Sequence, residues 1–114
     1  MTKLMIAGLL LLLAFPAKAD HLWYPGNSQI KAYTASDAVI DNGMGTRTSV
    51  VRLVCSTDCF VAFAISGQTP DASATTGIFL TQDEPHFFRI GAGEKIAVVR
   101  DAGDGTLYVT EFTK

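Results

Sequence analysis

The two cysteines of the chain, Cys55 and Cys59, are the residues whose type and spacing could most readily do chemistry. They lie in the apolar run VVRLVCSTDCFVAFAI, which covers residues 50–65. Facing cysteines in an exported protein usually form a disulfide, whereas a redox pair typically has the C-x-x-C spacing at the start of a helix. We predict a structural disulfide, with two reduced cysteines as the first alternative and metal or redox chemistry as the second.

Histidines would have to complete any metal site, and the chain has only His21 and His86. Neither lies at a sequence spacing from the cysteines that is typical of zinc modules. His86 follows Asp83 and Glu84, and a histidine beside carboxylates is one arrangement used in acid–base catalysis. However, no serine or cysteine nucleophile has a recognisable structural context. We therefore expect a solvated loop at His86, no metal, no cofactor and no enzymatic activity.

Two glycine-containing segments have only part of a ligand-binding pattern. The segment DAGDGT, residues 101–106, has Gly103 and Gly105 where an EF-hand loop needs oxygen ligands. The segment GAGEK, residues 91–95, lacks the spacing of a phosphate-binding loop and the Ser or Thr that follows its lysine. We expect the first segment to be a hairpin loop and the second to be a turn before a strand.

The first nineteen residues have the pattern of a secretory signal peptide. Lys3 precedes an apolar run over residues 4–15, a proline ends this run, and the small residues of the sequence AKA end at Ala19. The run is shorter than the roughly 20 apolar residues that a membrane-spanning helix needs. We expect cleavage after Ala19, export to the periplasm, the medium or a virion, and no stable membrane anchor in the mature chain.

The mature chain is small and mildly acidic. Removing residues 1–19 from the 114 residues leaves 95 and takes away Lys3 and Lys18, which changes the formal net charge from −2 to about −4. This length makes one small domain, which we expect to cover residues 29–114 after an N-terminal arm at 20–28. The basic residues do not cluster, as binding to nucleic acid would require. We therefore expect no nucleic-acid partner.

Apolar residues along the mature chain come in short alternating runs, separated about every eight to twelve residues by Gly, Asp, Asn, Ser or Pro. This pattern is typical of an all-β sandwich or barrel. We predict a single small antiparallel β-sandwich, Ig-like or jelly-roll-like, with about seven strands. The predicted strands cover residues 29–35, 46–55, 59–66, 77–81, 86–90, 95–100 and 106–112.

The cysteines lie at the ends of two of these predicted strands. If residues 56–58 form a hairpin loop, Cys55 lies opposite Cys59, and every second residue of both strands points to one side of the hairpin. The resulting apolar face would contain Val51, Leu53, Cys55, Cys59, Val61, Phe63 and Ile65.

The sequence from Val50 to Thr113 resembles small proteins encoded by tailed phages and prophages. The resemblance rests on the order of several segments: VRLVCSTDCFVAF, then EPHFFR, then GEKIAVV, and last GTLYVTE. What it implies is a compact β-sandwich without known catalysis, in proteins that are uncharacterised or virion-associated. The pattern has no catalytic residue to transfer, and this chain departs from it by its export signal.

Two functional classes fit these observations. The first is a structural or interaction protein of a virion or surface assembly, with protein partners that include further copies of the chain. The second is an exported binding module for a carbohydrate or another ligand. Exposed aromatic residues would serve either role, because they combine a large apolar area with a polar group. The candidates for such contacts are His21, Trp23, Tyr24 and Tyr33.

Overall fold

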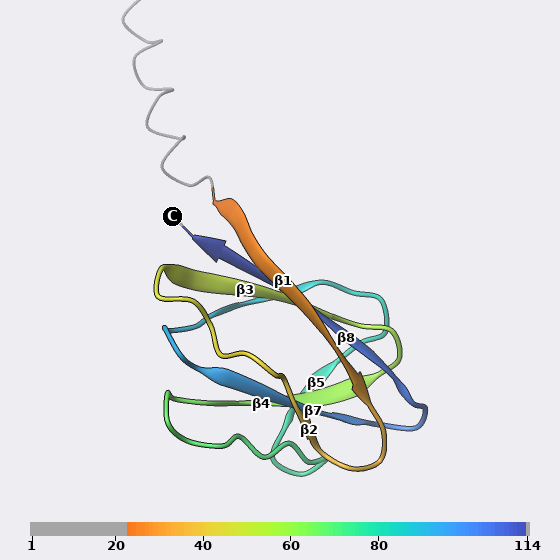
Figure 1. Ribbon diagram of the computed structural model, residues 1–114. Helices are drawn as coiled ribbons and strands as arrows, with labels where there is room; N and C mark the ends of the chain where they lie inside the picture. Colours follow the sequence, from red (N-terminus) through yellow and green to blue (C-terminus); the bar gives the residue numbers. More distant parts are fainter. Residues whose placement is uncertain (1–22, 114) are drawn as a thin grey trace, which may run out of the picture.

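Alternating apolar residues form eight strands within residues 23–113, the part of the chain that the computed structural model describes. The strands form two antiparallel sheets, the first with the order β1-β8-β3-β6 and the second with the order β2-β7-β4-β5 (Figure 1). The predicted β-sandwich is therefore confirmed, whereas the predicted signal peptide and His21 lie outside the described residues. The strands are β1 (Tyr24–Tyr33), β2 (Ala38–Val39), β3 (Thr48–Cys55), β4 (Cys59–Ala64), β5 (Ile78–Leu80), β6 (His86–Arg89), β7 (Lys95–Arg100) and β8 (Gly105–Thr113).

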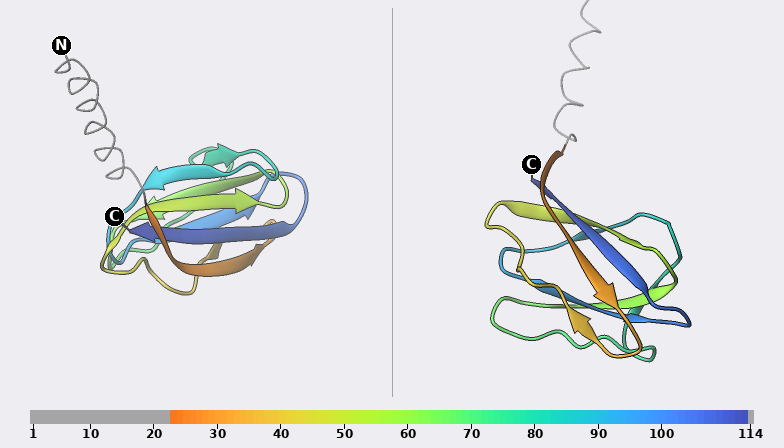
Figure 2. Two further views of the ribbon diagram at one scale, coloured as in Figure 1. Left: turned by 90° about the horizontal axis from the view of Figure 1, so that it is seen from above. Right: turned by 45° about the vertical axis from the view of Figure 1, so that its right-hand side comes forward.

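The pairing of the strands follows a simple rule. β1 pairs with β8, β2 with β7, β3 with β6 and β4 with β5, as in one long hairpin whose two arms are folded over together. The pairs β3–β8 and β4–β7 then complete the two sheets. This is the jelly-roll arrangement. It makes every connection except the one between β4 and β5 cross from one sheet to the other (Figure 2).

The main core lies between the two sheets and is built by alternate residues of each strand. In β3, for example, Val51, Leu53 and Cys55 are fully buried, while Arg52 and Val54 point outward and are partly exposed. A smaller apolar cluster lies on the outer side of the second sheet, where Ala72 of the β4–β5 loop covers β7. The first sheet has no such covering loop among the described residues.

The predicted hairpin between β3 and β4 is wrong. β3 pairs with β6 and β8 in the first sheet, and β4 pairs with β5 and β7 in the second. The residues expected on one hairpin face are instead on opposing inner faces of the sandwich. Both arrangements bury every second residue, so alternation alone does not distinguish them. Ile65 lies beyond the end of β4 and is 60% exposed, so it does not extend the apolar face.

Three further expectations also need correction. The segment 101–104 is not a hairpin loop, because it joins β7 of the second sheet to β8 of the first. β1 begins at Tyr24 rather than at residue 29, so most of the expected N-terminal arm belongs to the sheet. The short strand Ala38–Val39 had no counterpart in the prediction, because two residues are too few to show an alternating pattern.

Candidate functional site

The disulfide predicted from the sequence is present between Cys55 and Cys59. Cys55 ends β3 and Cys59 begins β4, their Cα atoms are 6.3 Å apart, and both residues are fully buried. The bond therefore joins the two sheets where the chain crosses between them. The loops 34–37, 56–58, 81–85 and 101–104 lie at this end of the sandwich, on the right of Figure 1. We call these four loops the disulfide end.

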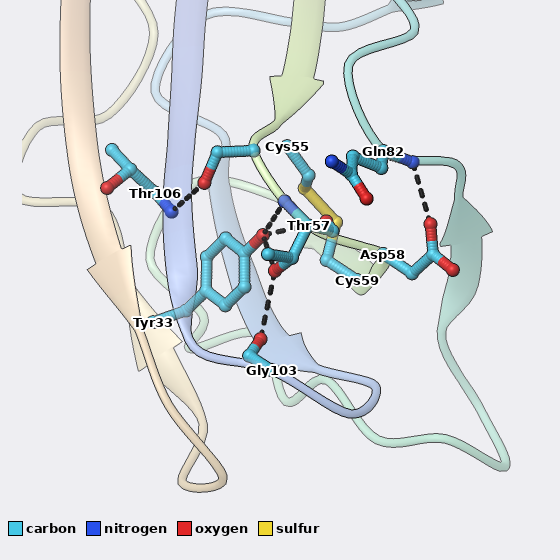
Figure 3. The surroundings of a disulfide bond; sticks show 9 residues. Tyr33, Cys55, Thr57, Asp58, Cys59, Gln82, Gly103 and Thr106 are labelled. Atoms are coloured by element: carbon cyan, nitrogen blue, oxygen red, sulfur yellow. Dashed lines mark hydrogen bonds between the residues drawn. A yellow bond between two sulfur atoms is a disulfide. The ribbon is translucent and has the colours of Figure 1, made fainter.

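Tyr33 is part of the disulfide end and not of an exposed surface. It is only 1% exposed, so its predicted exposure is wrong. Its hydroxyl accepts a hydrogen bond from the Thr57 N–H at 3.0 Å and lies 2.8 Å from the Thr57 carbonyl oxygen (Figure 3). The Thr57 hydroxyl in turn donates to the Gly103 carbonyl oxygen at 2.9 Å. The phenol thus fixes Thr57 of the β3–β4 loop, and the Thr57 hydroxyl joins this loop to the β7–β8 loop.

Further hydrogen bonds connect the loops of the disulfide end. The Asp58 carboxylate accepts a hydrogen bond from the Gln82 N–H at 2.8 Å (Figure 3), and the Asp58 carbonyl oxygen accepts one from the Asp101 N–H. The Asp83 N–H donates to the Cys55 carbonyl oxygen at 2.8 Å, and Asp83 has a positive φ of 59°. Aspartate tolerates this conformation better than most residues. The disulfide end is therefore a mutually braced set of loops.

The disulfide end is strongly acidic. Its four loops contain no lysine or arginine. Among the described ion pairs, the one at this end joins Asp104 to Arg100 at the end of β7, at 2.6 Å. Asp83, Glu84 and Asp101 are exposed, and none of them forms an ion pair in the described structure. The acidic residues of these loops are Asp37, Asp58, Asp83, Glu84, Asp101 and Asp104.

Three aromatic rings form a cluster on the outer face of the first sheet. The Trp23 ring lies 6.3 Å from those of Phe87 in β6 and Phe112 in β8, and these two are 6.2 Å from each other. Trp23 directly precedes β1, which is one edge strand of the sheet. Its ring nevertheless reaches Phe87 of β6, which is the opposite edge strand. Phe87 remains 52% exposed and Trp23 40% exposed. Tyr24, the neighbouring candidate, is also exposed.

The centre of the same outer face combines an arginine with more aromatic and polar groups. Arg52 of β3 lies opposite Phe87 on one side and Thr110 on the other. Tyr108, which is 47% exposed, lies opposite Ile30 and diagonally from Arg52. A shallow groove of about 360 Å³ runs along this part of the sheet. Its polar lining residues are Ser28, Gln29, Arg52, Tyr108 and Thr110.

The charge of this outer face is opposite to that of the disulfide end. Arg52 and Arg89 are the charged residues at outward positions of the four strands, as the pairing of Val50 with Arg89 and of Arg52 with Phe87 places them. Within residues 23–113, neither arginine forms an ion pair. We call this outer side of the β1-β8-β3-β6 sheet, with its aromatic residues and its two arginines, the aromatic face.

The outer side of the second sheet differs because the β4–β5 loop lies across it. Asp37 accepts a hydrogen bond from the Ala72 N–H of this loop at 3.4 Å. Partial burial of its carboxyl and a hydrogen bond with Asp71 raise the pKa of Asp37, and the bond from Ala72 opposes this rise.

His86 is not the solvated loop residue that the sequence predicts. It is the first residue of β6, its side chain is half-buried, and its Nε2 atom has no hydrogen-bond partner among the described residues. Within residues 23–113, no group of three or more His, Cys, Asp or Glu side chains is arranged to hold a metal ion. In the same part of the chain, no helix has the length and hydropathy that crossing a membrane requires.

Sequence reasoning identified Trp23 but missed its partners on the aromatic face. The signal was available, because Phe87, Tyr108 and Phe112 occupy alternate, outward positions of strands that the sequence predicts correctly. Several aromatic residues at outward positions of neighbouring strands form an exposed apolar patch, which marks a candidate contact. What the sequence could not show is that β6 and β8 lie in one sheet with β1.

Comparisons with known proteins place the chain in no family. Neither a protein family nor a curated protein matches the sequence. Among solved structures, one match is the coat protein of Tobacco streak virus, with a TM-score of 0.38 and 11% sequence identity. The match covers 80% of this chain and 89% of the coat protein. At this identity and score, it bears on neither the family nor the function of the chain.

Proposed function

We propose that the protein is a non-enzymatic interaction domain of a virion or cell-surface assembly, exported after cleavage behind Ala19. Jelly rolls occur in viral capsid proteins and in lectins, and a fold does not determine a function. The proposal therefore rests on the surface of the molecule rather than on its topology.

The observation that carries the proposal is the aromatic face. Trp23, Phe87 and Tyr108 keep 40% to 52% of their surface exposed on one side of a single sheet. Contiguous exposed apolar groups mark interaction sites, and aromatic residues and arginine are enriched in protein interfaces. Part of the outer side of the second sheet, over β7, is covered by a loop of the same chain. This contrast makes the first sheet the better candidate for contact with a partner.

Two other observations support the setting. A buried disulfide between Cys55 and Cys59 suits an oxidising compartment, which agrees with an exported protein. The resemblance to small phage-encoded proteins favours a virion or a surface assembly over a free secreted protein. Protein partners are accordingly the first expectation for the aromatic face.

Site-specific photo-crosslinking tests this proposal. A photoreactive phenylalanine analogue replaces either Phe87 on the aromatic face or Phe79 in β5, an edge strand of the second sheet that is similarly exposed. We expect crosslinks to protein from position 87 and few from position 79 when the variants are made in the cells that produce the protein. Equal crosslinking at both positions, or none at position 87, would contradict the proposed use of this face.

A carbohydrate ligand is the second candidate, and the groove on the aromatic face favours it. Sugar rings stack on aromatic side chains, and hydroxyl groups bind polar residues such as Arg52, Ser28 and Thr110. Trp23 is the single tryptophan of the chain, and its ring packs on Phe87, which lies opposite Arg52 of the groove. We therefore expect its fluorescence to respond to a bound ligand. A saturable change with oligosaccharides that is lost in Tyr108→Ala would favour the carbohydrate. No change would favour the protein partner.

A further inference from the structure

We infer that the partner of the aromatic face is the disulfide end of a second copy of the chain, in a head-to-tail contact. This inference rests on the proposed function, because it names the partner of an interaction domain. Four observations support it: the opposite charges of the two surfaces, the charged groups on each that have no ion pair, the braced shape of the loops, and the location of the two surfaces on different parts of one molecule.

The charges of the two surfaces are complementary. The aromatic face presents Arg52 and Arg89 at outward strand positions, without an acidic residue at the described outward positions. The disulfide end presents acidic residues in four loops that contain no lysine or arginine. Complementary potentials steer association and select partners. Both surfaces belong to one chain, so each molecule carries both halves of the contact.

Each surface has charged groups without an ion pair in the described part of the molecule. The described ion pairs are Lys31 with Asp41 and Arg100 with Asp104. Arg52, Arg89, Asp83 and Glu84 are therefore available for pairing with another molecule. An arginine paired with a carboxylate in a partly desolvated contact binds more strongly than an exposed pair in water.

The β5–β6 loop has the shape and composition to meet the aromatic face. The three consecutive residues Asp83, Glu84 and Pro85 are exposed. The Asp83 N–H donates a hydrogen bond to the Cys55 carbonyl oxygen. The disulfide and the hydrogen bond from the Gln82 N–H to the Asp58 carboxylate hold this loop in place. A braced loop loses little conformational entropy on binding. Its carboxylates would pair with the two arginines while Pro85 contacts an aromatic ring.

The positions of the two surfaces predict a head-to-tail contact between the copies. One surface is the outer side of a sheet and the other is the end of the sandwich, so the contact joins different patches of the two copies. Such heterologous contacts form rings or filaments. An assembly of this kind agrees with the proposed structural role.

Charge reversal provides the test. Sedimentation velocity of the purified protein at rising concentration should show association that weakens with added salt. The variant R52E/R89E makes both surfaces negative, and the variant D83K/E84K makes the β5–β6 loop of the disulfide end positive. We expect each variant alone to associate at least about tenfold more weakly than the unmodified protein. An equal mixture should restore association, because the arginines of one variant then meet the acidic β5–β6 loop of the other, and the introduced glutamates meet the introduced lysines.

Three controls make the result specific. Lys95→Glu reverses a charge on β7 of the second sheet and should leave association unchanged. Circular dichroism and thermal unfolding of each variant show whether the fold is intact. The restored association in the mixture itself excludes misfolding as the cause of the losses.

Two results would overturn the inference. One is a protein that stays monomeric at every concentration and at low salt, with no association in the mixture of variants. The other is self-association that R52E/R89E does not weaken. If position 87 still crosslinks to another protein in either case, the proposed function stands and only the identity of the partner is wrong. If an acidic oligosaccharide instead quenches Trp23 in the monomer and R52E abolishes this, the face binds a glycan.

Discussion

Tyr33 and Tyr108 have different roles because only the hydroxyl group of Tyr33 has hydrogen-bond partners in the described structure. The hydroxyl of Tyr33 is buried and bonds to the backbone of Thr57, whereas Tyr108 is 47% exposed and has no described hydrogen bond. Replacing Tyr33 by Phe leaves the Thr57 N–H and carbonyl groups without this partner. We expect Tyr33→Phe to lower the free energy of unfolding by about 1 to 3 kcal/mol, measured by urea denaturation.

Tyr108→Phe is the matched control for this prediction. It removes the same atom from a residue at the surface, so we expect a change within about 0.5 kcal/mol. Hydrogen exchange at Thr57 adds a local measurement, because its amide should lose protection in Tyr33→Phe and keep it in Tyr108→Phe. Equal stability of the two variants would mean that the hydroxyl of Tyr33 does not brace the disulfide end.

At the scale of the element, the β4–β5 loop contacts Asp37, whose carboxyl group accepts a hydrogen bond from the Ala72 N–H. The pKa of Asp37 is raised by partial burial and by Asp71, so the folded state favours the protonated acid. This contribution to stability is present below the ordinary aspartate pKa and is lost as the pH rises through the raised value. Asp37→Asn has no such loss and still offers an oxygen to the Ala72 N–H. We therefore expect Asp37→Asn to be more stable than the unmodified protein at pH 7, by less than about 1 kcal/mol.

The difference should depend on pH in a defined direction. Urea denaturation of both proteins should show a gap that opens as the pH rises above about 4 and closes at about pH 3, where the aspartate is protonated. Asp101→Asn is the control, since it removes one negative charge from the same end of the sandwich without touching the loop. A gap that widens toward acid pH would show that Asp37 is held as the carboxylate.

The elements were more predictable than their connections. The strands around Val51 and Val61 follow from alternation, and so does the inward direction of both cysteines. The choice between a hairpin and a crossing between sheets depends on which strands pair, and this is decided by residues far away in the sequence. Tyr33 was misplaced for the same reason. Its position at the end of an alternating strand gives no sign that the loop at Thr57 folds over its hydroxyl.

The whole molecule is organised by the pairing of its first and last strands. β1 pairs with β8, and the ring of Trp23 before β1 packs on Phe112 of β8 and Phe87 of β6. The aromatic face therefore exists only when the chain is completely wrapped. The acidic disulfide end is likewise assembled from four loops that are distant in sequence. This explains why composition alone, which shows a mild net negative charge, did not predict two oppositely charged surfaces.

The same topology leads to a prediction about folding speed. Pairings between strands that are distant in sequence make folding slow, because loop-closure entropy is lost before contacts form. The fluorescence of Trp23 reports on the pairing of β1 with β8, since Trp23 precedes β1 and its ring contacts β6 and β8. We expect stopped-flow refolding from urea to restore this fluorescence in about milliseconds to seconds. The disulfide should change this rate by less than about tenfold, because a bond between residues four apart closes only a short loop. Refolding within microseconds, or a reduced protein that does not recover the signal, would show that the β1–β8 pairing is not the slow step or that the bond is needed to form it.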